Sequence, residues 1–340
     1  MSLPAGELAV ATESSGAARF DAGPEAAAIE GRSLGVIAWR RLRHDKVAMT
    51  GGVVALLLVL VAVFARPLTA LYGHDYLTPN NTGSTNLTDP MTTMPLGNYG
   101  GISGSHWLGI TPVSGNDILA QLIYGARTSL IIGAMATLLS LLFGVSLGLI
   151  AGYFRGWSDS FISRIMDLLL SFPTLLFSIA LITVLSFTNS VLGLSGQPLR
   201  FALIIFVLGF FGFPYIGRIV RGQVLSIREK EFVDAARSLG ASNYRIMTRE
   251  IMPNLVGPIL VYTTLTIPNN ILGEAGLSFL GVGVQAPTPS WGQMLSDAGN
   301  YYQVDPTYLF LPGIAIFISV MAFNLFGDGL RDALDPKSTQ

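Results

Sequence analysis

Between Lys46 and Arg66 the chain reads VAMTGGVVALLLVLVAVFA (Val47–Ala65), a run of apolar and small residues without a single charge. A helix needs about 20 mostly apolar residues to cross the hydrocarbon core of a bilayer, so this run predicts a membrane span. A cleaved signal peptide has a shorter apolar region near the start of the chain, whereas a long polar segment precedes this one. We therefore expect an uncleaved transmembrane helix.

Further apolar segments of membrane length follow at about Thr128–Tyr153, Ile165–Leu185, Phe201–Gly217, Leu255–Gly273 and Tyr308–Phe326. Hydrophobic residues make up 51% of the chain, charged residues make up 12%, and the mean hydropathy is +0.55. A soluble domain carries about a quarter charged residues. The composition therefore predicts an all-α membrane protein with six transmembrane helices.

The basic residues indicate how these spans are oriented. Of the 20 Lys and Arg residues, all but Arg66, Arg127 and Arg200 fall in segments that lie inside if the N-terminus is cytoplasmic. The positive-inside rule then places both termini in the cytoplasm. The predicted organisation is a disordered cytoplasmic tail (1–30), a juxtamembrane segment (31–46), the first span (47–65), a long extracytoplasmic loop (66–127), a core of five spans (128–327) that includes a polar loop at 221–254, and a cytoplasmic C-terminal tail (328–340).

The polar loop carries the segment EFVDAARSLGASNYRIMTREIMP (Glu231–Pro253) between two apolar runs. Its apolar positions Phe232, Ala235, Ala236 and Leu239 follow the spacing of one helix face. Gly240 then stands where a helix would end, Ser242 is placed to cap a second short helix, and Pro253 marks the entry to the next span. The segment predicts a hairpin of two short amphipathic helices.

Three interpretations of this hairpin compete. It could lie in the lipid headgroups, with Arg237, Arg245 and Arg249 touching anionic lipid. A DNA-binding helix-turn-helix is disfavoured because the membrane lies only a few residues away on each side. The third interpretation is a docking site for a soluble partner, since an exposed apolar face needs another surface to cover it.

The motif residues favour docking. Asp234-Ala235-Ala236, Gly240 and Met252-Pro253 resemble the EAA loop of ABC importer permeases, with Asp234 for the usual Glu, Glu250 where Ile is common and Met252 for Leu. Other blocks are similar to permeases of the dipeptide, oligopeptide and nickel class: His106–Gly133 (with Asn116 for a usual Arg), Met166–Ile179, Gly273–Leu295 and, in the C-type subunit, Asn324–Pro336.

The resemblance implies the type I ABC importer permease fold in the bacterial cytoplasmic membrane, surrounded by lipid. It implies a homologous permease as partner, two ATP-binding subunits that hold ATP and Mg, and an extracytoplasmic substrate-binding protein that docks on the outer loops. The expected activity is uptake of di- or oligopeptides, with nickel or another small solute, or an ATPase-independent carrier, as alternatives. The residues implied to couple to the ATPase are Glu231, Asp234, Ala235, Ala236, Arg237, Gly240, Met252 and Pro253.

Within the spans, Pro173 and Pro268 are expected to kink their helices, either to line a polar path or to serve packing alone. Asn269 and Asn270 are expected to face the interior or a partner chain, and Asp167 to pair locally with Arg164. Glu274 is a candidate to cap a turn or to contact substrate or the binding protein.

No catalytic motif is visible in the sequence. It has no phosphate-binding G-x-x-x-x-G-K-[ST] loop and no cysteine, and its three histidines (His44, His74 and His106) are scattered without metal-ligand spacing. No nucleic-acid partner is indicated. We expect a transport subunit that binds no metal or cofactor of its own and is not an enzyme.

Overall fold

A computed structural model describes residues 34–79, 87–97, 99–186, 190 and 193–334. Within these ranges every regular element is a helix, which confirms the all-α fold. The helices are α1 (Leu34–His44), α2 (Lys46–Val63), α3 (Ala65–Tyr72), α4 (Ile118–Phe154), α5 (Gly156–Ser171), α6 (Thr174–Ser186), α7 (Gly196–Ile227), α8 (Glu231–Ser238), α9 (Asn243–Arg245), a π-helical turn (Ile246–Ile251), α10 (Met252–Phe279), α11 (Trp291–Ala298) and α12 (Pro306–Leu334). The predicted tail 1–30 and the last residues of the predicted C-terminal tail lie outside the described residues.

Five helical stretches are long and apolar enough to cross a membrane, and α5 with α6 makes a sixth if this bent pair is one span. The two helices meet at an angle of 84°. The break falls at Pro173, and the preceding Phe172 has an extended backbone (φ −77°, ψ 136°) because a residue before proline disfavours the helical region. The kink expected at Pro173 is thus a full break, and the predicted span Ile165–Leu185 is two helices.

The segment expected as an extracytoplasmic loop over 66–127 is helical at both ends. Its first residues form α3, which ends at Gly73 in a left-handed conformation. Its last residues belong to α4, which begins at Ile118, ten residues before the predicted start at Thr128. Asp117 caps this helix, because its side chain accepts a hydrogen bond of 2.8 Å from the backbone N–H of Ala120. The hydropathy pattern missed this start because Gln121 and Arg127 lie in the first turns.

Helices α4 and α7 pack closely along their length, and glycines on α4 make this approach possible. Gly144, Gly148 and Gly152 stand four residues apart on one face of α4. A methyl group on Gly148 would lie 2.6 Å from the carbonyl oxygen of Gly217, and one on Gly152 would lie 2.7 Å from Val224. Small residues at this spacing are typical of membrane helices whose backbones touch.

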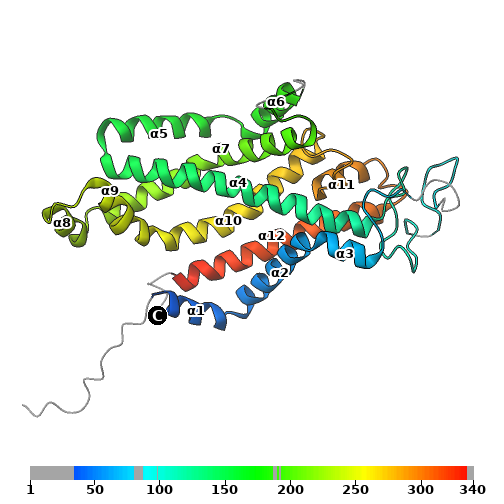
Figure 1. The fold of residues 1–340 in the computed structure, drawn as a ribbon, viewed down its shortest axis with the longest axis horizontal. Coiled ribbons are helices and arrows are strands. Elements are labelled where there is room, and N and C mark those ends of the chain that lie inside the picture. The colour runs from blue at the N-terminus through cyan, green and yellow to red at the C-terminus, as the bar shows by residue number, and fades with distance from the viewer. Residues whose placement is uncertain (1–33, 80–86, 98, 187–189, 191–192, 335–340) are drawn as a thin grey trace, which may run out of the picture.

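The long helices run side by side, so the molecule has two distinct ends (Figure 1). Helices α8 and α9 lie at one end, together with α1 and the C-terminal end of α12. Helix α3, the segment that leads to α4, and α11 lie at the other end. We call these the hairpin end and the loop end.

The second arm of the hairpin differs from the sequence prediction. Instead of a separate short helix, α9, the π-helical turn and α10 form one uninterrupted helix from Asn243 to Phe279. Pro253 does not separate the arm from the span because it occupies the first turn of α10, where proline is tolerated. Pro268 also lies within this continuous helix.

Candidate coupling surface and buried polar layer

Helix α8 turns its predicted apolar face away from the rest of the chain. Phe232, Ala235 and Leu239 are exposed, with Leu239 at 88%, and Ala236 is only partly buried. Tyr244, at the start of the second arm, is 74% exposed. Ala236 packs against the buried cluster beneath the hairpin. The other four residues form an apolar surface that nothing in the described part of the chain covers, and we call it the α8 face.

Val233 holds α8 to the bundle. Its side chain is fully buried in an apolar cluster with Tyr153, Ile246 and Leu255. The sequence analysis did not single out this residue, because Val233 lies outside the apolar stripe of α8. Its burial fixes the helix so that the α8 face points outward.

The base of the hairpin is tied to the end of α4. Tyr153 donates a hydrogen bond of 2.8 Å from its hydroxyl to Oδ1 of Asn243. Arg228 donates from Nη1 to the carbonyl oxygen of Tyr153, and Arg155 pairs with Glu229 at 2.7 Å. A displacement of the hairpin would therefore move α4 and α7 as well.

The remaining residues implied in coupling lie on or beside this hairpin. Asp234 and Arg237 form an exposed ion pair of 3.0 Å within α8. Gly240 makes the turn with φ +80°, a conformation that favours glycine. Glu231 and Pro253 are exposed, whereas Met252 and Glu250 are partly buried.

Hydrogen-bonded polar side chains are buried between α4, α10 and α11, and we call them the buried polar layer. Glu274 of α10 is fully buried, and its carboxylate accepts hydrogen bonds from Ser129 (2.8 Å) and Ser278 (2.7 Å). Ser129 Oγ in turn accepts the backbone N–H of Trp291 at 3.2 Å. Glu274 therefore joins α4, α10 and α11 inside this chain, with no exposed surface of its own.

The other intramembrane candidates divide between the interior and the surface. Asn270 is buried and donates a hydrogen bond of 2.9 Å to Oγ1 of Thr137 on α4. Asn269 is exposed and donates to the carbonyl oxygen of Leu265 in its own helix. Pro268 is buried, while Pro173 is exposed at the break before α6.

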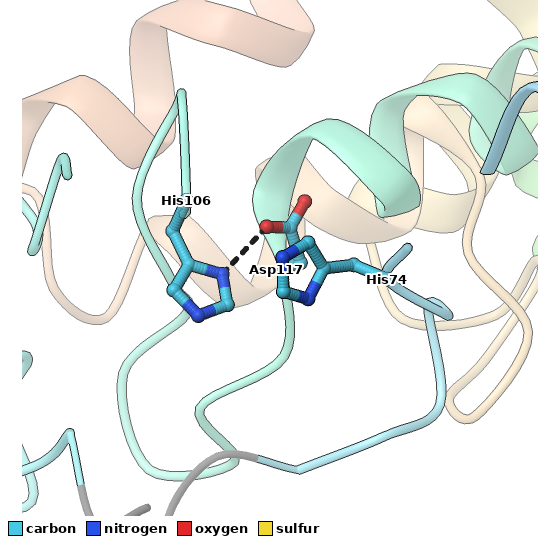
Figure 2. Close-up of side chains that lie close together, drawn as sticks. All are labelled: His74, His106 and Asp117. Carbon is cyan, nitrogen blue, oxygen red and sulfur yellow. Dashed lines mark hydrogen bonds and ion pairs between the residues drawn. The ribbon is translucent and has the colours of Figure 1, made fainter. Parts of the chain in front are cut away.

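Two expectations about polar contacts were wrong. Asp167 pairs with Arg218 of α7 rather than with Arg164, because α5 packs against α7 over these turns. The histidines are not all scattered, since His74 and His106 lie together beside Asp117 at the loop end (Figure 2). Sequence spacing could not show this, because the two histidines are far apart along the chain.

Family models match both parts of the chain. Residues 33–90 match the N-terminal TM domain of oligopeptide transport permease C, and residues 144–340 match the binding-protein-dependent transport system inner membrane component. The chain belongs to the binding-protein-dependent transport permeases. The resemblance predicted from the sequence is therefore confirmed, and such a permease is the membrane component of an ABC importer whose ATPase is a separate subunit.

Relatives of this permease span nearly its full length. It is 41% identical over 300 residues to the dipeptide transport system permease protein DppC of Alkalihalophilus pseudofirmus, covering 88% of this chain and 89% of that protein. It is 37% identical over 299 residues to the glutathione transport system permease protein GsiD of Pectobacterium atrosepticum, covering 88% and 90%. Escherichia coli GsiD is 39% identical over the same length.

A solved structure supports the fold. Inward-facing MetNI, a methionine ABC transporter, aligns with this permease at a TM-score of 0.53 and 20% identity, covering 64% of this chain and 98% of that chain. At this identity the likeness shows the fold alone. The permease therefore has the architecture of an ABC importer subunit.

Proposed function

We propose that this chain is one of two permease subunits of an ATP-driven peptide importer, and that it forms the uptake pathway with a homologous permease. The names of its relatives, dipeptide and glutathione permeases, favour peptides over nickel or another small solute. The remaining partners would be two ATP-binding subunits, which carry ATP and Mg, and an extracytoplasmic substrate-binding protein. The complex would lie in the bacterial cytoplasmic membrane.

The α8 face is the observation that carries this proposal. An exposed apolar surface on a charged hairpin fits a soluble partner, and Val233 and Tyr153 fix it to the ends of the long helices. The hairpin end would be cytoplasmic, with both termini on that side, and the ATPase would cover Phe232, Ala235 and Leu239. Closure of the ATPases would then move α4, α7 and α10 together, which is how rigid elements switch access to a central path.

The pathway would run along the exposed side of α10, where Asn269 faces away from this chain's own core. Asn270, Glu274 and Pro268 are buried within the chain and would position that helix rather than touch substrate. The bend at Pro173 would let α6 close one side of the path. Substrate selection would rest mainly with the binding protein at the loop end.

The test is peptide uptake by the reconstituted complex. Ala235→Glu places a charge in the centre of the α8 face and is expected to reduce uptake and peptide-stimulated ATP hydrolysis at least tenfold, while the chain still inserts in the membrane. Ala235→Ser, which keeps a small side chain, is the matched control and should retain most activity. Uptake by the isolated chain without ATPase, or full activity of Ala235→Glu, would contradict the proposal. Labelled dipeptides, longer peptides, glutathione and Ni²⁺ would be compared as substrates.

A further inference from the structure

Three side chains capable of binding a metal ion converge at the loop end (Figure 2). His74 follows the turn that ends α3, His106 lies in the segment before α4, and Asp117 caps α4. One donor atom from each lies within 4.8 Å of the other two. His106 and Asp117 are buried at 3% and 0% exposure, and His74 is partly buried.

We propose that His74, His106 and Asp117 form a binding site for a divalent transition-metal ion, of which Zn²⁺ is the best match. This site is separate from the proposed peptide uptake and does not depend on it. Two imidazoles and one carboxylate suit ions such as Zn²⁺, whereas Mg²⁺ and Ca²⁺ prefer sites built from oxygen. Three protein ligands leave a fourth, tetrahedral position for water.

The distances fit an ion after a small local movement. Zn²⁺ binds nitrogen and oxygen at about 2.0–2.2 Å, so donors around a tetrahedral ion stand about 3.3–3.5 Å apart. His106 Nδ1 and Asp117 Oδ2 are 2.8 Å apart, joined by a hydrogen bond. An ion would replace the proton between them and widen this gap slightly. The ring centroids of His74 and His106 are 4.4 Å apart, and the three donor atoms lie within 4.8 Å of one another, so His74 would rotate its ring to bring a donor nitrogen to the ion.

His74 has the freedom to make this movement. It is partly exposed and follows Gly73, whose φ of +86° ends α3. Beside it lies a cavity of about 320 Å³ that Arg66 and Asp75 also line. The cavity gives an ion a route to His74, and Asp75 contributes a carboxylate to its lining.

The surrounding contacts orient the ligands as in established metal sites. Tyr72 donates a hydrogen bond of 3.0 Å from its hydroxyl to Asp117 Oδ2 and accepts the backbone N–H of Trp107 at 3.0 Å. Asp117 Oδ1 accepts the N–H of Ala120. Outer partners that hold a ligating carboxylate are a regular feature of metal sites, because they fix its position and basicity.

A bound ion would join two parts of the chain that are separated in sequence. His74 lies beyond the outer end of α3, which continues the first span, and Asp117 starts α4. The site would therefore hold His106 against the end of α3 and the start of α4, at the loop end. In the absence of an ion, the Tyr72–Asp117 hydrogen bond already links the end of α3 to the start of α4, and the ion would add His74 to this junction.

The test is Zn²⁺ binding by the full-length chain, purified in detergent with a histidine-free affinity tag and stripped with chelator. We expect one Zn²⁺ per chain by equilibrium dialysis and elemental analysis, and a higher thermal midpoint when Zn²⁺ is present. His74→Ala should weaken binding at least tenfold and abolish the thermal shift. The variant should fold, because His74 is partly exposed and the His106–Asp117 bond remains.

His44→Ala is the matched control, because His44 is exposed in α1 and, among the described residues, bonds only to the Arg40 carbonyl oxygen of its own helix. It should bind Zn²⁺ as the wild type does. Co²⁺ provides a second readout, since its visible absorption reports imidazole ligands and should be lost in His74→Ala. Failure of the wild-type chain to bind Zn²⁺, or equal affinity of His74→Ala and wild type, would overturn the proposal.

Discussion

Glu274 of α10 and Ser129 of α4 are joined by a buried hydrogen bond of 2.8 Å, in which the serine hydroxyl donates to the carboxylate. The same hydroxyl accepts the backbone N–H of Trp291, so one side chain connects three helices. Buried polar groups in membrane helices are costly unless they are satisfied in this way.

Ser129→Ala is expected to destabilise the protein by about 1–3 kcal/mol, because it removes one hydrogen bond to the buried Glu274 carboxylate and the bond that the Trp291 amide makes to the Ser129 hydroxyl. Unfolding of the purified chain in detergent measures this loss. Ser171→Ala is the control, since Ser171 is exposed and, in the part of the chain that the structure describes, bonds only within its own helix. It should change stability by less than about 0.5 kcal/mol. Equal losses in the two variants would show that the bond to Glu274 contributes nothing specific.

Gly148→Ala should separate α4 from α7. The added methyl group would lie 2.6 Å from the Gly217 carbonyl oxygen, which is backbone and cannot rotate away. Overpacking of this kind costs about 1–3 kcal/mol. Gly222→Ala is the matched control, because that α7 glycine has no atom within 4 Å of the added methyl group and alanine favours a helix. Thermal unfolding should show a lower midpoint for Gly148→Ala only.

Asp297→Asn should change how stability depends on pH. Burial raises the pKa of the Asp297 carboxyl in α11, while a hydrogen bond from Gln293 opposes part of this rise. Because the pKa of Asp297 is raised in the folded state, the protonated carboxyl stabilises the fold relative to the charged one. This stabilisation is present below the unfolded-state pKa of about 3.9 and is lost as the pH rises through the folded-state pKa. The Asn side chain does not titrate, so Asp297→Asn does not lose this stability as the pH rises.

Thermal midpoints measured between pH 4 and pH 8 would test this prediction. Asp297→Asn should exceed the wild type at pH 7, and the difference should shrink as the pH falls toward 4. A constant difference across this range would indicate that the carboxyl does not titrate with a raised pKa.

Single cysteines can test the proposed orientation, because the natural chain contains none. Ser238→Cys on α8 and Ser105→Cys at the loop end are both at exposed positions. If the hairpin end is cytoplasmic, a membrane-impermeant maleimide should label Ser105→Cys in intact spheroplasts. It should label Ser238→Cys only after the membrane is opened. The reverse pattern would invert the topology.

The sequence predicts the broad architecture because charge and hydropathy act locally. Lys46 and Arg66 bound the first apolar run, and α2 occupies most of it. The turn at Gly240 follows equally from residue type, since it needs a left-handed conformation. The start of α4 can also be inferred from residue type, because Asp117 is a good N-cap residue, whereas hydropathy marks only the apolar part of this helix.

Contacts between distant residues were not predictable in the same way. The pairing of Asp167 with Arg218 depends on how α5 packs against α7, and the convergence of His74 with His106 depends on how the loop folds back. The sequence analysis missed Val233 because the apolar residues at helical spacing in α8 lie mostly on the exposed face, and Val233 lies outside that stripe. The periodicity was correct, but its usual interpretation as the buried face does not hold for a surface that lacks its partner.

The uninterrupted helix from Asn243 to Phe279 has a mechanical consequence. At 1.5 Å per residue its 37 residues form a lever arm of about 55 Å, with Tyr244 near one end and Glu274 near the other. A tilt of about 5° pivoted at Tyr244 would displace Glu274, about 45 Å along the helix, by about 4 Å. A small rotation at one end of this helix is therefore geometrically amplified at its other end.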